Sequence, residues 1–340
     1  MSDRTIDVHC HFLPPALIEL LQVEGPRHSI HITEKDGKRF ASFAGRPTQP
    51  IPGGMLDLEE RLDWMDQRGI DLQILSAWMG FSSHALDPED GLWLASLLNE
   101  LTLEAIAPHA DRFAAMADVP IQEPKLAAEE LRRAVGELGM VGVEIGTSVA
   151  DRELDDESLT PFWSEAEQLD VAVLVHPYSS LGVGADRLQR YFLSNSVSNP
   201  AEETVAASYL IFGGVLERHP ALRVCLTHGG GFLPYQIGRL DQSLVATPDL
   251  ASTNISQRPS SFLPRFLYDT VVHSPEALRF LVDRVGHDRV VIGSDYPFPM
   301  GDPDPLATIA AAGFEAPVKR AIVFENAARE WPAALADRSS

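Results

Sequence analysis

The sequence is poor in cysteine, poor in basic residues and free of long apolar runs. Its two cysteines, Cys10 and Cys225, lie in apolar segments typical of strands, so we expect buried thiols and no disulfide. No run of about 18 apolar residues occurs, which excludes a membrane-spanning helix. The polar start, Met1 to Thr5, is not followed by the apolar core of a signal peptide. We therefore expect a cytoplasmic protein.

The charge balance excludes several classes of partner. The 340 residues include 27 Lys and Arg against 49 Asp and Glu, a formal net charge of −22. Nucleic acids and anionic membranes need basic surfaces, so we expect neither as a partner. A small acidic substrate is not excluded, because a pocket can be locally positive in an acidic protein. With 45% hydrophobic residues the chain can form a large core, and we expect residues 1–340 to be one domain.

Short apolar runs alternate with helical patterns along the chain. The expected strands are 5–11, 70–76, 113–119, 141–145, 171–176, 222–228, 266–272 and 290–295. Helical spacing is found at 55–69, 90–109, 124–138, 161–169, 201–218 and 275–285, and a closing helix begins at 317. Eight such repeats, with strands apolar on both faces, predict an α/β fold of the (β/α)8 TIM barrel type.

One segment departs from this alternation. Residues 28–43, "HSIHITEKDGKRFASF", contain two alternating runs joined at Asp36-Gly37, which indicates a β-hairpin. We expect a small β insertion over about 28–50, after the first strand, that covers part of the barrel mouth.

Polar side chains that can bind a metal stand where several predicted strands end. His9 and His11, in "IDVHCH", are two residues apart on one strand and therefore point to the same side. His176 ends "VAVLVH", His228 ends "LRVCLTH" and Asp295 ends "VVIGSD". The carboxyl ends of barrel strands face the active site. One such residue could be a helix cap, but five together predict a metal site.

These motifs resemble the amidohydrolase superfamily, and within it the aminocarboxymuconate-semialdehyde decarboxylase family. The similarity is carried by "DVHCHFLPP", "ELGMVGVEIGT", "VHP", "PAEETVAASYLIFGGVLERHPALRVCLTHGGGFLPYQIGRLD" and "VVIGSDYPFPMGD". It extends over most of the chain and is densest from Pro200 to Asp302. The resemblance implies a barrel with one Zn²⁺, nonoxidative loss of CO₂ from a small acid, and a homodimer. Mn²⁺ is also possible, since imidazole and carboxylate suit both ions.

The resemblance also implies roles for individual residues. The metal ligands would be His9, His11, His176 and Asp295. His228 would act on the metal's water or on the substrate, and Asp295 would take part in catalysis as well. Arg46, in "FAGRPTQP", would bind a substrate carboxylate, although a solvated loop residue is the alternative. Arg239, in "QIGRLD", would reach the neighbouring subunit's site, the alternative being a surface ion pair with Asp241.

Two departures from the family pattern concern the pocket. The decarboxylases of the family usually read His-Pro-Trp after the fifth strand, but here Tyr178 replaces the Trp and the loop "SSLGVG" differs. Tyr178 and Phe298, in "DYPFP", are expected to contact the substrate. Glu144, in "VGVEIGT", stands where relatives often have a neutral amide. It either pairs with a nearby base or arginine, or bridges to a second metal as in some hydrolases of the superfamily.

The remaining histidines and one glycine-rich segment are weaker candidates for a functional role. His273 could end the seventh strand near the site, but the polar start of the next helix is the favoured interpretation. The other expected surface histidines are His84, His109, His219 and His287. "THGGGF" lacks the Lys-Ser/Thr of a phosphate loop.

Three functions follow from these patterns. The first is a metal-dependent decarboxylase of a small unsaturated or aromatic acid, of the aminocarboxymuconate-semialdehyde or hydroxybenzoate kind. The second is a metal-dependent hydrolase or hydratase of a related acid. The third is a non-catalytic metal-binding barrel, which would leave His228 without a purpose.

Overall fold

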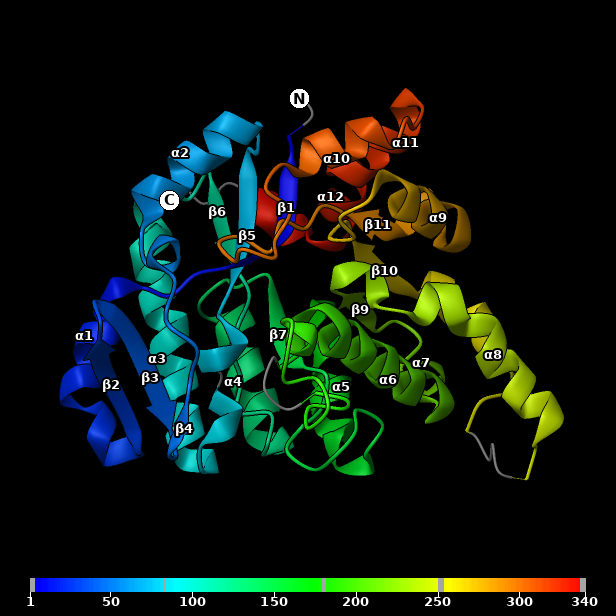
Figure 1. Cartoon of the computed structure of the whole chain (residues 1–340). Helices are drawn as coiled ribbons and strands as arrows, with labels where there is room; N and C mark the ends of the chain where they lie inside the picture. Colours follow the sequence, from blue (N-terminus) through cyan, green and yellow to red (C-terminus); the bar gives the residue numbers. More distant parts are fainter. Residues whose placement is uncertain (1–3, 82, 179–181, 250–253, 337–340) are drawn as a thin grey trace.

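The computed structural model describes residues 4–81, 83–178, 182–249 and 254–336. Two parallel sheets form its centre, in the orders β1-β5-β6 and β7-β8-β9-β10-β11 (Figure 1). The strands are β1 (Ile6–His11), β5 (Leu72–Ser76), β6 (Phe113–Ala115), β7 (Gly142–Gly146), β8 (Ala172–His176), β9 (Arg223–Leu226), β10 (Phe266–Asp269) and β11 (Val290–Val291).

Backbone contacts join the two sheets at both of their open edges. At one edge, Asp7 bridges Ile292 in parallel, and the amide of Val8 donates to the carbonyl of Ile292 at 2.9 Å. At the other edge, Ala117 bridges Val143 in parallel. The eight strands therefore form a ring, and the predicted (β/α)8 barrel is confirmed.

Helices surround the ring, as Figure 1 shows. They are α1 (Pro15–Val23), α2 (Leu58–Arg68), α3 (Pro88–Ile106), α4 (Pro124–Gly136), α5 (Thr160–Gln168), α6 (Asn199–Phe212), α7 (Val215–Arg218), α8 (Leu233–Ala246), α9 (Pro275–Val285), α10 (Pro305–Ala311), α11 (Ala316–Arg320) and α12 (Asn326–Glu330). Within the described ranges, none of these helices is both long enough and apolar enough to cross a membrane.

Strand side chains alternate between the two sides of the ring wall. On β8, Val173 and Val175 pack outward in the cluster that includes the surrounding helices, whereas Leu174 belongs to a separate cluster of strand residues inside the ring. Trp331, which follows α12, joins that inner cluster. His176 follows Leu174 by two residues and therefore faces the ring interior, at the carboxyl end of the strand.

The predicted β insertion is present as a three-stranded antiparallel sheet of β2 (Ile30–Lys35), β3 (Lys38–Phe43) and β4 (Arg46–Pro47). Asp36 and Gly37 join the first two strands with φ of 53° and 71°, as a two-residue hairpin turn requires. Phe43 packs in a cluster with Trp78, which follows β5. The insertion therefore lies beside the carboxyl ends of the barrel strands and forms one wall of the barrel mouth.

Several boundaries differ from the sequence prediction. Helices α1, α8 and α10 were not predicted, and the helix expected over 201–218 is divided at Gly214, whose φ is 73°. The sixth and eighth barrel strands end before His228 and Asp295. Both residues have positive φ, 48° and 55°, which a strand ladder does not accommodate.

Candidate metal centre and active site

An irregularity in β1 places its two histidines. The pairing of β1 with β5 changes register between Asp7 and Cys10. Val8 packs in the cluster inside the ring, and His9, directly after it, faces the site. In a regular strand, consecutive side chains point to opposite faces. The register change lets Val8 and His9, although consecutive, both point into the ring. His9 and His11 are completely buried.

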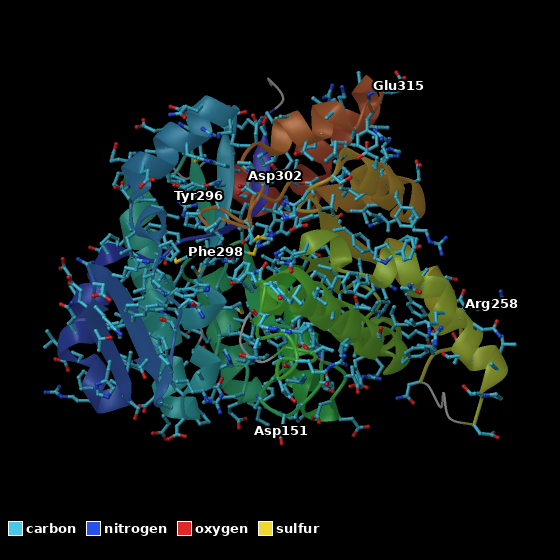
Figure 2. All side chains as sticks on the ribbon, viewed as in Figure 1. Asp151, Arg258, Tyr296, Phe298, Asp302 and Glu315 are labelled. Carbon is cyan, nitrogen blue, oxygen red and sulfur yellow. The ribbon has the colours of Figure 1, made fainter. Side chains whose placement is uncertain are left out.

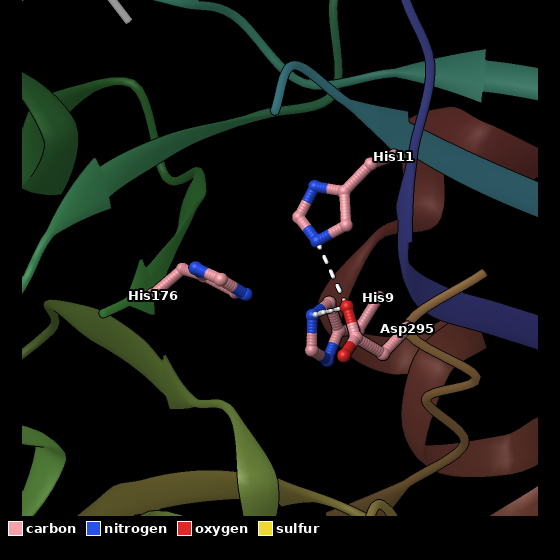
Figure 3. A group of neighbouring side chains, drawn as sticks. All are labelled: His9, His11, His176 and Asp295. Atoms are coloured by element: carbon pink, nitrogen blue, oxygen red, sulfur yellow. Dashed lines mark ion pairs between the residues drawn. The ribbon is translucent and has the colours of Figure 1, made fainter. Parts of the chain in front are cut away.

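Four side chains from β1, β8 and the segment after β11 converge on one point. His9, His11, His176 and Asp295 each offer an atom, and these atoms lie within 4.8 Å of one another. Asp295 Oδ1 is 3.4 Å from His9 Nε2 and 3.2 Å from His11 Nε2, the contacts drawn in Figure 3. His176 approaches from the opposite side of the group in that view. All four side chains predicted as ligands are thus brought together.

The histidine rings are oriented by bonds at their other nitrogen. His9 Nδ1 is 2.6 Å from Asp269 Oδ2, His11 Nδ1 is 3.1 Å from the carbonyl of Ala77, and His176 Nδ1 is 2.9 Å from the carbonyl of Pro177. Among the described residues, no hydrogen bond satisfies the three Nε2 atoms or Asp295 Oδ1, although all are buried. Three imidazoles with Nδ1 engaged and Nε2 free are the arrangement that metal ligation requires. The donor set therefore fits a divalent ion.

Burial and pairing set the charges of this group. Burial lowers the pKa of His9, but the nearby carboxylates of Asp269 and Asp295 outweigh that effect and raise the pKa to about 10. Burial alone acts to raise the pKa of Asp295, but its histidine neighbours hold it well below the usual value. Burial lowers the pKa of His176 well below its usual value, and the neighbouring imidazoles add to this. The metal-free group therefore combines an anionic Asp295 with a protonated His9.

His228 lies next to the four ligands and is held by a carboxylate from α6. Its Nε2 is 3.6 Å from Asp295 Oδ2, and its Nδ1 is 2.7 Å from Glu203 Oε1. Burial acts to lower the pKa of His228, but Glu203 and Asp295 raise it well above the usual value. The amide of Gly229 donates to Asp269 Oδ1 at 2.8 Å, which fixes the turn that carries His228.

A pocket opens above these residues. It has a volume of about 190 Å³, which suits a small molecule, and His176, His228 and Asp295 form part of its lining. The β insertion contributes Phe43 and Arg46 to the wall. His176 and Asp295 of the metal-binding group are therefore accessible to a small ligand in this pocket.

Sequence comparison places the chain among known enzymes. Residues 6–332 match the amidohydrolase family. The chain belongs to the amidohydrolase family. This amidohydrolase is 36% identical over 298 residues to the 2-amino-3-carboxymuconate-6-semialdehyde decarboxylase of Dictyostelium discoideum, covering 87% of the chain and 82% of that relative. The resemblance predicted from the motifs is confirmed.

One further relative in sequence and one solved structure are also similar to this chain. The gamma-resorcylate decarboxylase of Rhodococcus jostii (strain RHA1) is 29% identical over 258 residues, covering 72% of the amidohydrolase and 78% of the relative. The solved structure of a dihydroxybenzoic acid decarboxylase from Polaromonas sp. JS666, with bound manganese and the inhibitor 2-nitroresorcinol, superimposes with a TM-score of 0.80 at 22% identity. That superposition covers 99% of both chains and shows the same fold.

The predicted substrate contacts of the amidohydrolase divide into two groups. Arg46, Tyr178 and Phe298 all line the pocket. The ring of Phe298 lies 5.3 Å from that of His11, and Figure 2 labels it in the segment after β11. Arg239 instead lies exposed on α8, outside the pocket lining of this chain. The carboxylate of Asp241, its suggested surface partner, accepts from the amide of Ser260.

Glu144 lies beside the metal-binding group without joining it. Its Oε1 is 3.9 Å from His11 Nδ1, and neither carboxylate oxygen has a hydrogen-bond partner within the described ranges. Burial raises the pKa of Glu144 well above its usual value. Of the two expected kinds of partner, a base is present in His11, and no arginine pairs with Glu144 among the described residues.

Two histidines expected at the surface are not there. His84 lines the pocket together with Arg46 of the insertion, and its ring centroid lies 4.2 Å from that of Tyr178. His219 is 6% exposed, and its Nδ1 is 3.0 Å from Glu167 Oε2. His273 follows the end of β10 and precedes Ser274, which caps α9, as the favoured interpretation had it. Residues 179–181 of the divergent loop after Tyr178 lie outside the described residues.

Sequence reasoning missed Glu203 and Asp269, the carboxylates that orient His228 and His9. Asp269 ends the apolar run "FLYD", the same signal that identified Asp295. The seventh strand was expected to continue to 272, so Asp269 was taken as internal. Glu203 stands in the first half of α6 beside Glu202, and no sequence signal separates the two.

Proposed function

We propose that this amidohydrolase is a metal-dependent decarboxylase of a small unsaturated or aromatic carboxylic acid. The observation that carries the proposal is the convergence of three imidazole Nε2 atoms and Asp295 beneath a pocket that His228 also lines. The decarboxylases of Dictyostelium discoideum and Rhodococcus jostii support the reaction type. An acid of the aminocarboxymuconate-semialdehyde or hydroxybenzoate kind fits this proposal best.

The proposed cofactor is Zn²⁺, with Mn²⁺ as the alternative. Its ligands would be His9, His11, His176 and Asp295. Three imidazoles and one carboxylate suit both ions, and the Polaromonas enzyme binds manganese. When bound, the ion supplies a positive charge that stabilises the negative charge developing on the substrate.

Side chains around the pocket would supply the proton transfer, the binding of the substrate and the exclusion of water. Loss of CO₂ breaks a carbon–carbon bond and leaves the electron pair on the substrate, where a proton must replace the carboxyl group. We assign this proton transfer to Nε2 of His228, which lines the pocket. Arg46, on the wall formed by the insertion, would bind a carboxylate of the substrate. Phe298 and Tyr178 would pack against the body of the substrate and exclude water.

We further propose a homodimer in the cytoplasm, in which the single domain of each chain gives Arg239 to the partner's pocket. Its exposure on α8 leaves the guanidinium available for this contact. Arg239→Ala should then raise KM for an acidic substrate severalfold and leave metal content unchanged. An unchanged KM in the dimeric protein would remove Arg239 from the site.

A hydrolase or hydratase is the second candidate, and Glu144 favours it. A buried carboxylate 3.9 Å from His11 could support a second ion, as two-metal hydrolytic sites require. Metal analysis of the loaded enzyme distinguishes the two candidates, because one ion per chain is expected of the decarboxylase. Two ions per chain, lost in Glu144→Gln, would favour the hydrolase.

The decisive experiment follows CO₂ release and product mass for the metal-loaded enzyme with a panel of hydroxybenzoates and muconate-type acids. The expected result is loss of CO₂ from at least one acid, abolished by a chelator and restored by Zn²⁺ or Mn²⁺. A product heavier by one water, without CO₂, would replace the decarboxylase by the hydratase. Metal binding without turnover of any acid would leave only a binding protein.

A further inference from the structure

Glu203 is a buried carboxylate whose position serves His228. It is fully buried in α6, and its Oε1 lies 2.7 Å from His228 Nδ1. The hydroxyl of Thr227, the residue before His228, also donates to Oε1 and lies 3.0 Å from the carbonyl of Val175. One carboxylate oxygen thus contacts two consecutive residues at the point where the chain leaves β9.

This contact decides which nitrogen of His228 carries the proton. A carboxylate oxygen only accepts hydrogen bonds, so the nitrogen 2.7 Å away must donate. In the neutral ring, Nδ1 then holds the proton and Nε2 keeps its lone pair. Nε2 is the atom that faces Asp295 Oδ2 at 3.6 Å, on the side of the metal-binding group.

We propose that Glu203 is a positioning residue for proton transfer: its carboxylate keeps the His228 proton on Nδ1 and directs Nε2 to the substrate. The inference rests on the proposed function in assigning the proton transfer to His228. In each turnover, the imidazolium of His228 gives its Nε2 proton to the carbon that loses CO₂, and the neutral ring, still protonated on Nδ1, regains a proton at Nε2 from solvent. Glu203 stabilises the imidazolium that exists before the transfer and leaves the metal ligands untouched.

The alternative is that Glu203 only anchors α6 to the end of β9. Both roles predict that a large substitution destabilises the protein, so stability cannot separate them. They differ in what Glu203→Gln does. The carboxamide is nearly the same size, but its NH₂ can donate to Nδ1 and move the His228 proton to Nε2.

The first test compares Glu203→Gln with wild type and with Glu104→Gln, an exposed residue of α3. We expect kcat to fall about 100-fold in Glu203→Gln, with KM, metal content and Tm nearly unchanged. Glu104→Gln should match wild type. In the His228→Ala background, Glu203→Gln should cost no further activity, because the group it positions is gone.

The second test needs no turnover. Long-range ¹H–¹⁵N spectra of the Zn²⁺-loaded protein with ¹⁵N-labelled histidine report which ring nitrogen is protonated. We expect Nδ1 to be protonated in wild-type His228 and a shift towards Nε2 in Glu203→Gln. The wild-type spectrum decides this even if the variant fails to fold.

Several results would overturn the proposal: a kcat within twofold of wild type in folded Glu203→Gln, an additive loss in the double variant, or a wild-type His228 protonated on Nε2 alone. Failure of the proposed function looks different. In that case no acid loses CO₂ with the wild-type enzyme, while the spectra still report whether Glu203 sets the tautomer.

Discussion

The carboxylate of Asp269 lies 2.6 Å from Nδ1 of His9, while its other oxygen accepts the amide of Gly229 at 2.8 Å. One buried side chain at the end of β10 therefore orients a metal ligand and holds the turn that carries His228. The metal-binding group and the proposed proton-transfer residue are connected through a single carboxylate.

Asp269→Asn is expected to weaken metal binding by about 10- to 100-fold. The amide keeps the shape of the side chain but removes the charge that fixes the His9 tautomer. Competition with a metal-binding dye measures the change, and Asp283→Asn, exposed on α9, is the matched control. An affinity equal to that of wild type would show that His9 needs no charged partner.

Metal binding should release protons. The pKa of His9 is raised to about 10, so near pH 8 the metal-free ring carries a proton on both nitrogens. An ion can bind Nε2 only after the proton on that nitrogen leaves, so binding of one ion should release about one proton. For the same reason, the apparent affinity for the ion should fall about tenfold for each pH unit below 10. Calorimetric titration in buffers of different ionisation enthalpy measures the number. Uptake without proton release would contradict the charge assigned to His9.

His84 should make the fold sensitive to acid. Burial, and then the charge of Arg46, lower the pKa of His84 to about 4, whereas an unfolded histidine has about 6.5. Between these two pH values only the unfolded chain binds the proton, which favours unfolding. The free energy of unfolding is therefore unaffected by the titration of His84 above pH 6.5 and decreases as the pH falls to 4. The loss amounts to about 3 kcal/mol at most.

Urea unfolding of wild type and His84→Phe across this range provides the measurement for His84. The variant should lose less stability than wild type between pH 6.5 and 4, and His287→Phe, at an exposed position, should follow wild type. Parallel curves for wild type and His84→Phe would show that His84 titrates normally.

Gly146 at the end of β7 leaves the space that Tyr178 fills. A Cβ at this position would come within 1.9 Å of Tyr178 Cζ, closer than any real contact. Gly146→Ala should therefore displace the ring, destabilise the protein by about 1–3 kcal/mol and change binding in the pocket. Gly136→Ala is the control, since nothing lies within 4 Å of a Cβ there. Equal unfolding midpoints for the two variants would mean that Tyr178 moves without cost.

The sequence predicted the barrel and the four converging side chains because both depend on local patterns. Apolar runs that stop at a polar residue mark the ends of barrel strands, and the spacing of His9 and His11 places both on one side. The orienting residues depend on tertiary approach instead. Glu203 matters only because α6 packs against the end of β9, and no periodicity shows which of two adjacent glutamates turns inward.

The errors have similar causes. His84 was expected at the surface because a loop position gives no sign that the residue will line a pocket and contact the ring of Tyr178. Two strands end earlier than their apolar patterns indicated, at Leu226 and Val291, and His228 and Asp295 beyond them have positive φ. A side-chain pattern records neither the segments that will lie against a loop residue nor the backbone dihedral angles at the end of a strand.

The seam between the first and last strands has a consequence for synthesis of the protein. The amide of Asp295 donates to the carbonyl of His9 at 2.8 Å, so ligands 286 positions apart in sequence meet where the ring closes. During synthesis, His9, His11 and His176 leave the ribosome long before Asp295 does. The four-residue metal-binding group therefore forms only after synthesis has passed Asp295, and a chain that holds all four side chains together has closed its barrel.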